Sequence, residues 1–160
     1  MYVVEVLFDT DDRGLAAEMV VEAARAALTH EQAPAGEMTV LLAGDDRLAE
    51  LNRQFMGEDG PTDVLAFPSG ESTPAPELPV YLGDVAISLD RAKSQAEAAG
   101  HTLLQESQLL VVHGTLHLLG HDHSEPDEKR VMWLAQNEIL GQLGVPTAFL
   151  DALLREASLS

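Results

Sequence analysis

Apolar positions along the chain follow two periods, which predict short strands interleaved with longer helices. Alternating, Val-rich segments predict four strands at residues 2–8, 38–43, 63–67 and 80–88. Apolar residues at helical spacing predict helices at residues 15–28, 45–55, 88–99, 102–119 and 127–143, with a short helix or tail at 147–157. Residues 9–12 are predicted to turn into the first helix, and the Pro-rich segment 69–79 is predicted to be a surface loop.

The order of these elements favours an α+β fold in a single domain. Strands and helices do not follow each other in strict βαβ succession, and 160 residues suit one core. We expect a domain at residues 1–143 in which four strands are packed by five to six helices. Residues 144–160 are predicted to form a C-terminal helical extension, which would pack on the domain or bind a partner through its apolar residues Phe149, Leu150, Leu153 and Leu154.

The charge of the chain limits how it could bind nucleic acid. Twenty-seven acidic residues stand against nine basic ones, for a net charge of -18. Bulk attraction to phosphates is therefore excluded, and a nucleic-acid substrate would need local help from a metal, a few well-placed cations or a partner. We see no positively charged leader segment and no apolar run of about 20 residues, so we expect a cytoplasmic protein without a membrane partner.

A dense group of histidines, in the stretch HGTLHLLGHDH, carries the strongest chemical signal. Four of the six histidines lie within 11 positions, and the chain has no cysteine. His113 and His117 are four residues apart, so on a helix their rings are offset by about 40° and about 6 Å and can point at one ion. Gly120 can end the helix in a left-handed conformation, which would return His123 to the same ion.

Three imidazole ligands with an open fourth position are typical of a catalytic zinc site. We therefore predict one zinc ion per chain at the C-terminus of a buried helix, held by His113, His117 and His123. Three histidines buried without a metal would cost several kcal/mol. A two-histidine iron site that uses Asp122 is an alternative, although Asp122 fits better as a turn residue or as an outer group that orients a ligand. His121 could be a fourth ligand, a proton carrier or, as we expect, a surface residue.

The same histidine spacing fits the metzincin protease pattern, apart from one position. That pattern needs a glutamate directly after the first histidine as the general base, and this chain has Gly114 there. Without this carboxylate peptide hydrolysis lacks its proton acceptor. The spacing therefore indicates a metal-activated hydrolase of another kind, in which the metal would activate water or polarise the bond to be cleaved.

The histidine stretch closely resembles the signature of the YbeY family of bacterial endoribonucleases and rRNA maturation factors. Two further blocks are similar to that family and occur in the same order: LNRQF at 51–55 with PTDVLAFP at 61–68, and LGDVAIS at 82–88. The resemblance implies a central four-stranded mixed sheet, zinc on the three histidines and endoribonuclease activity on single-stranded RNA. It also implies roles in 16S rRNA 3′-end maturation and ribosome quality control, with an rRNA precursor, small-subunit proteins and an assembly GTPase as partners.

One position departs from the family pattern. The family usually carries Arg directly after the aromatic residue of the LN block, where this chain has Met56. Arg53, one helical turn earlier, is a candidate substitute.

Other features of the site stay open. Asn52, Thr62 and Asp63 could line the cleft or serve the turn and helix around them. No residue is identified as the general base, and the nucleophile could be water or the ribose 2′-hydroxyl. A non-catalytic ribosome-assembly factor with a bound metal, or another metal-dependent hydrolase, remains the alternative.

Overall fold

A four-stranded mixed sheet forms the centre of the protein, as the sequence predicted. The structure is a computed structural model that describes residues 1–11, 14–70 and 79–145. The strands are β1 (Tyr2–Asp9), β2 (Gly36–Ala43), β3 (Val64–Pro68) and β4 (Val80–Ser88). Their order in the sheet is β1-β2-β4-β3, in which β1, β2 and β4 are parallel and β3 is antiparallel to β4. The predicted α+β class and strand positions are confirmed.

Five α-helices accompany the sheet in the described part of the chain. They are α1 (Ala17–His30), α2 (Asp45–Leu51), α3 (Leu89–Ala99), α4 (Leu103–Leu118) and α5 (Pro126–Gln142). A π-helical turn, η1 (Asn52–Met56), follows α2. None of the helices in these residues is long and apolar enough to cross a membrane. The predicted helix at 147–157, and with it most of the predicted extension, lies outside the described residues.

Two predicted helix boundaries were wrong. The helix expected at 45–55 is a regular α-helix only to Leu51. It continues as the wider π-helical turn η1, which ends at Gly57 in a left-handed conformation (φ 68°). The side chain of Asn52 donates to the carbonyl of Gly60 at 3.0 Å, which ties down the following turn. The first helix begins at Ala17, later than expected, because Leu15 is first inserted into the core.

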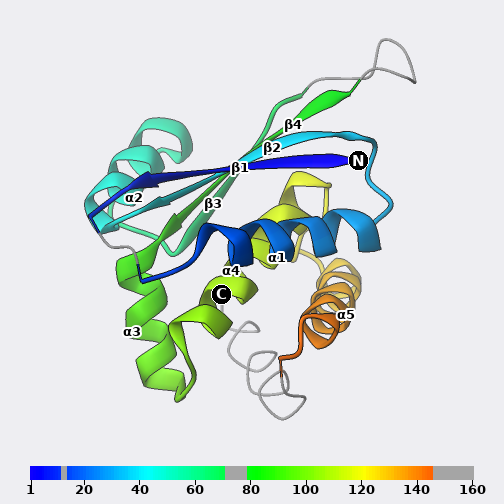
Figure 1. The fold of residues 1–160 in the computed structure, drawn as a ribbon. Coiled ribbons are helices and arrows are strands. Elements are labelled where there is room, and N and C mark those ends of the chain that lie inside the picture. The colour runs from blue at the N-terminus through cyan, green and yellow to red at the C-terminus, as the bar shows by residue number, and fades with distance from the viewer. Residues whose placement is uncertain (12–13, 71–78, 146–160) are drawn as a thin grey trace.

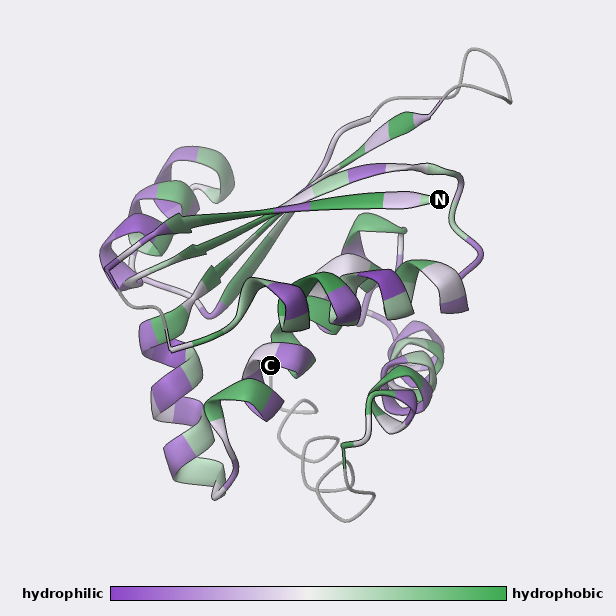
Figure 2. Cartoon of the chain, viewed as in Figure 1, coloured by the Kyte–Doolittle hydropathy of each residue, from purple (hydrophilic) through white to green (hydrophobic). Residues whose placement is uncertain are grey.

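The two faces of the sheet are covered unequally (Figure 1). Helices α1, α3, α4 and α5 lie on one side and enclose the larger apolar core, whereas α2 lies on the other side over a small cluster around Leu48, Leu51 and Leu65. Figure 2 shows that the strands are mostly hydrophobic while α3 is largely hydrophilic. The helix predicted to be buried, α4, packs against α1, α3, α5, β3 and β4 and is central to the larger core.

The start of α4 and its close approach to the sheet follow from its sequence. Thr102 accepts from the backbone N–H of Gln105, and the Gln105 side chain accepts from the backbone N–H of Thr102, which is a capping box. In the middle, Gly114 lets the helix approach the sheet, because a Cβ there would lie 2.6 Å from Cγ1 of Val85. The C-terminal half of α4 is thereby pressed beneath β3 and β4.

Candidate metal centre

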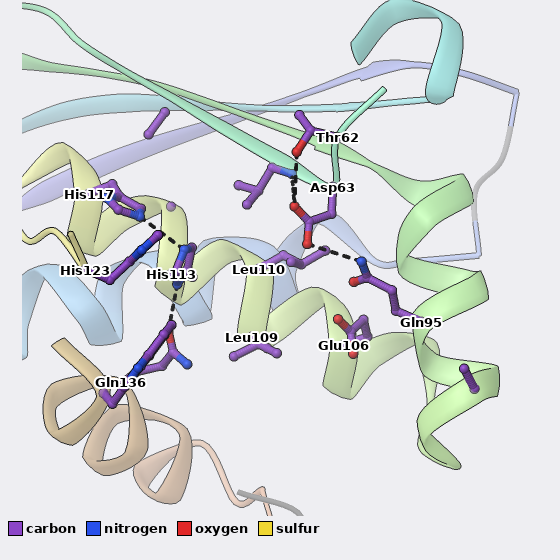
Figure 3. Close-up of a pocket in the computed structure, with 15 residues that line it drawn as sticks. Thr62, Asp63, Gln95, Glu106, Leu109, Leu110, His113, His117, His123 and Gln136 are labelled. Atoms are coloured by element: carbon purple, nitrogen blue, oxygen red, sulfur yellow. Dashed lines mark hydrogen bonds between the residues drawn. The ribbon is translucent and has the colours of Figure 1, made fainter. Parts of the chain in front are cut away.

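A cavity of about 490 Å³ lies between β3, α3, α4 and α5 and contains the predicted site (Figure 3). His113 and His117 enter it from α4, and His123 enters from the loop between α4 and α5. One nitrogen of each ring lies within 4.8 Å of the other two. The Nε2 atoms of His113 and His117 are 3.1 Å apart. The structure thus brings together the three imidazoles that the sequence spacing singled out.

The turn after α4 explains how His123 returns to its partners. The N–H of Gly120 donates to the carbonyl of His117 at 3.1 Å, and the N–H of His121 donates to the carbonyl of Leu116 at 3.0 Å. This pair of bonds is a Schellman motif, which needs the left-handed conformation that Gly120 adopts (φ 98°). The predicted role of Gly120 is confirmed.

Asp122 holds the next part of the same loop. Its carboxylate accepts from the backbone N–H of His123 at 2.7 Å and from the hydroxyl of Ser124 at 3.1 Å. These two hydrogen bonds, first that of the His123 N–H, keep the pKa of Asp122 below its usual range. Asp122 is not part of the cluster of three imidazoles, and its contacts are those of a turn residue.

Two hydrogen bonds determine which nitrogens face the centre of the cluster. Nδ1 of His117 donates to the backbone carbonyl of His121 at 2.9 Å, and Nδ1 of His113 donates to Oε1 of Gln136 at 3.0 Å. A neutral imidazole carries a single N–H, so with Nδ1 protonated each ring has a bare lone pair on Nε2. The two Nε2 atoms that face each other across 3.1 Å are therefore both acceptors.

Burial keeps these rings neutral. Burial first, and then the nearby His117 ring, lowers the pKa of His113 to about 4. Burial, followed by the charge of His123, also lowers the pKa of His117. Two neutral rings in this arrangement direct their Nε2 lone pairs at each other, and a cation between them would remove the repulsion.

The spacing of these nitrogens fits a metal ion. Zinc–nitrogen bonds of about 2.0–2.1 Å in tetrahedral geometry place two ligand nitrogens about 3.3 Å apart, close to the observed 3.1 Å. His113, His117 and His123 can therefore hold a metal ion through three nitrogens and leave its fourth position open.

Helix α5 supports the cluster in a way that sequence reasoning missed. Trp133 stacks on His113 (ring centroids 5.5 Å apart) and on His123 (6.0 Å apart). Gln136, one turn later and 2% exposed, accepts the hydrogen bond of His113. The available signal was Gln136 itself, a polar residue within the apolar stripe of α5. Such a residue needs a buried partner.

The expectation that His121 is a surface residue was wrong. Its side chain is 16% exposed, and its Nε2 donates to the carboxylate of Glu31, which directly follows α1. Glu31 also accepts from His30 at 2.7 Å, and His30 contacts Glu138 of α5 at 2.7 Å. Burial alone would raise the pKa of Glu31, but the hydrogen bonds from His121 and His30 outweigh it and lower that pKa. The loop between α4 and α5, which carries His121 and His123, is thus linked by hydrogen bonds to the end of α1 and to α5.

The remaining candidate residues divide into two groups. Thr62 and Asp63 line the cavity, and Asp63 accepts from the N–H of Val64 at 2.8 Å. Arg53 and Met56 are exposed on η1 and do not line it. Asn52 does not line it either and serves the turn described above.

Gly114 gives a steric reason against a protease. The position that would carry the protease glutamate has no room even for a Cβ beside Val85. The general base of the metzincin pattern therefore could not be accommodated in this packing.

Comparisons with known proteins show the family and support the fold. A family model described as "Endoribonuclease YbeY" matches residues 7–144. A protein of that name from Chloroflexus aggregans is 46% identical over 151 residues, which cover 91% of this chain and 98% of the relative. One from Thermobifida fusca is 50% identical over 111 residues, covering 67% and 72% respectively. A solution structure of a Thermotoga maritima protein matches with a TM-score of 0.60 at 24% identity and covers 97% of this chain and 93% of that one, which supports the fold.

Proposed function

Because the chain belongs to the YbeY endoribonuclease family, we propose that it uses one zinc ion, held by His113, His117 and His123, to cleave single-stranded RNA. We place this activity in the cytoplasm, in 16S rRNA 3′-end maturation and ribosome quality control. Small-subunit proteins and an assembly GTPase would be its protein partners. We assign the activity to residues 1–143, a range close to the residues 7–144 that match the family.

The pair of bare nitrogens on His113 and His117 is the observation that carries this proposal. With Nδ1 of each ring donating to Gln136 or to the His121 carbonyl, a cation between the two Nε2 atoms accounts for their 3.1 Å approach. An all-nitrogen set with an open position favours zinc. When bound, zinc supplies Lewis acidity that polarises a phosphate oxygen and makes water more acidic.

The protein groups around the histidines have their own tasks in this proposal. Gln136 and the His121 carbonyl fix the ring orientations, which keeps the ligand nitrogens directed at one point. Trp133 covers one side of His113 and His123 and shields them from water. Thr62 and Asp63 form the opposite wall, past which the RNA would enter.

Helix α5 carries two cationic side chains near the histidines, of which Arg130 also pairs with Asp127 at 3.1 Å. Lys129 and Arg130 border a second cavity of about 370 Å³ that shares Trp133 with the first. Phosphates next to the scissile one would be bound there, which gives local compensation for the net charge of -18.

Zinc content and RNA cleavage, measured together, test the proposal. Wild-type protein should bind one zinc per chain and cleave single-stranded RNA, and a chelator should stop the cleavage. His117→Ala should lose both zinc and cleavage, whereas Asp122→Asn should keep the zinc, because Asp122 lies outside the cluster. Zinc binding without cleavage of any RNA would favour a non-catalytic assembly factor, and absence of zinc would contradict the proposed site.

One substrate change and one protein variant sharpen the test. A single 2′-deoxyribose at the cleaved position abolishes cleavage if the 2′-hydroxyl attacks, and leaves it unchanged if water attacks. Met56→Arg restores the usual family residue on η1. It should make log affinity for RNA fall more steeply with log salt concentration, by about 0.7 for one added phosphate contact. An unchanged slope would mean that position 56 does not contact the RNA.

A further inference from the structure

The cavity is much larger than a metal ion requires. Its volume is about 490 Å³, whereas a water molecule occupies only about 30 Å³ in the liquid. A volume of this size is typical of pockets that bind small organic ligands. The three histidines occupy one end, so most of the cavity is available to part of the substrate.

The rest of the cavity extends along α4, away from the histidines. Glu106 lies seven residues before His113 on the same face of α4, a separation of about 10 Å at 1.5 Å per residue. Leu109 and Leu110 lie between them, as Figure 3 shows, and Ala98 of α3 adds to this apolar lining. We call this part, lined by Asp63, Gln95, Ala98, Glu106, Leu109 and Leu110, the far pocket.

The polar groups of the far pocket are mainly hydrogen-bond acceptors. Asp63 and Glu106 contribute carboxylates, and among the described residues that line the cavity there is no Lys or Arg. Asp63 is held in place by the N–H of Val64 and by Nε2 of Gln95 at 3.2 Å. Glu106 is 3% exposed and is bound by Nε2 of His101 at 2.5 Å.

These features decide which part of an RNA could enter. A phosphate and the carboxyl oxygens of Asp63 and Glu106 are all hydrogen-bond acceptors, and no Lys or Arg lines the described cavity, so the phosphate belongs at the histidine end. A nucleobase is uncharged, has flat faces that suit the Leu109 and Leu110 surface, and can be unstacked from single-stranded RNA. Ionised carboxylates only accept hydrogen bonds, so they complement the amino groups of adenine, cytosine and guanine. Uracil has no amino group, and its one ring N–H donor, N3–H, lies between two carbonyl oxygens that a carboxylate would repel.

We propose that the far pocket binds the nucleobase next to the scissile phosphate and prefers bases that carry an exocyclic amino group. This inference rests on the proposed function, since it assigns the neighbouring phosphate to the histidines. Asp63 is the residue that reads the amino group, and Gln95 positions Asp63. Leu109, Leu110 and Ala98 bind the face of the base.

Base preference in cleavage is the first test. Short single-stranded RNAs with one mapped cleavage position are varied at each flanking nucleotide in turn, and kcat/KM is measured. On one side of the cleaved bond, adenine, cytosine and guanine should exceed uracil by about fivefold or more. Asp63→Asn offers an amide in place of the carboxylate and should remove or reverse this preference without loss of zinc. Equal kcat/KM for all four bases on both sides would overturn the proposal.

Filling the far pocket is the second test. Ala98→Leu should lower kcat/KM for ordinary RNA about tenfold, but much less for RNA with an abasic nucleotide at the preferred position. Ser94→Leu is the matched control, because Ser94 lies one turn earlier on α3, is exposed and does not line the cavity. An equal loss on ordinary and abasic RNA would contradict base binding in this pocket.

A binding measurement separates this inference from the proposed function. Trp133 is the single tryptophan of the chain and lies at the histidine end of the cavity, so its fluorescence reports ligands that enter there, and Ala98→Leu shows whether the signal depends on the far pocket. Adenosine, cytidine and guanosine added to metal-free protein should change the fluorescence at lower concentration than uridine, and Asp63→Asn should cancel the difference. Selective binding without any RNA cleavage would support the pocket while contradicting the nuclease. Cleavage of RNA without selective nucleoside binding would support the nuclease and contradict the base-binding role of the far pocket.

Discussion

The groups that can hold the metal and the groups that orient them come from different parts of the chain. His113, His117 and His123 lie within eleven consecutive residues, on one helix end and its turn. Gln136 and Trp133 come from α5. Glu31 follows α1 and binds His121, which is 90 residues later in the sequence. The local set supplies the nitrogen atoms and, through the His121 carbonyl, orients His117, whereas the distant set orients His113 and packs on His123. The strength of the site should therefore depend on both, but unequally.

Removing a local ligand should have the largest effect. His123→Ala leaves two nitrogens, and we expect metal affinity to fall about 1000-fold or more, beyond the ~10–100-fold typical of changes in outer-shell partners. Competition with a coloured chelator measures this, and circular dichroism verifies that the fold is kept. Affinity within tenfold of wild type would mean that His123 is not a ligand.

The next largest effect is the dependence of the stability of the metal-free protein on pH. In the metal-free folded protein the pKa of His113 is about 4, against 6.5 for an unperturbed histidine. Between these pH values the unfolded chain binds a proton that the folded chain does not. The free energy of unfolding should therefore fall as pH drops from 6.5 to about 4, by about 3 kcal/mol from His113 alone.

Urea unfolding of metal-free wild type and His113→Asn across this range isolates the contribution of that ring. The variant should show the shallower dependence on pH. Parallel curves would show that burial of His113 does not carry the cost we assign to it.

Removing a distant orienting group should weaken the site less. Gln136→Leu deletes the acceptor for Nδ1 of His113 and allows that ring to turn. We expect metal affinity to fall about 10–100-fold. Gln142→Leu, the same change at an exposed position at the end of α5, is the control and should leave affinity unchanged. If both variants match wild type, orientation by α5 is unimportant.

The smallest effect is expected where the orientation is indirect. Glu31→Gln keeps a hydrogen-bonding group beside His121 but removes its charge. His117 bonds the His121 backbone, which the Schellman turn also holds, so affinity should fall less than about tenfold. Glu138→Gln, at the exposed far end of the same network (67% exposed), should have no effect. If Glu31→Gln lowered metal affinity as much as Gln136→Leu does, Glu31 would be as important for orienting the ligands as Gln136.

The same division explains what could be predicted from the sequence. Ligand spacing and the Gly120 turn depend on residues within one or two turns, so local rules were sufficient to place them. The order of the strands depends on pairing between distant segments, and no local pattern encodes it.

The orienting residues were missed for the same reason. Trp133 is an ordinary apolar residue of α5 until the helix is packed against the histidines. His121 was taken for a surface residue because its partner Glu31 is remote in sequence. Gln136 was missed as well, although a polar residue on an apolar stripe is a visible signal.

The local origin of the three ligands also bears on when the protein acquires its metal. An ion at this site would close a loop of only eleven residues, and the entropic cost of closing a loop grows slowly with its length. Helix α4 is anchored by its own buried residues, and no strand depends on the ion for its place in the sheet. A newly synthesised chain can therefore fold first and load metal afterwards, unlike small zinc domains that unfold without it. The supply of metal would then regulate how much of the protein is active, and leave the amount of folded protein unchanged.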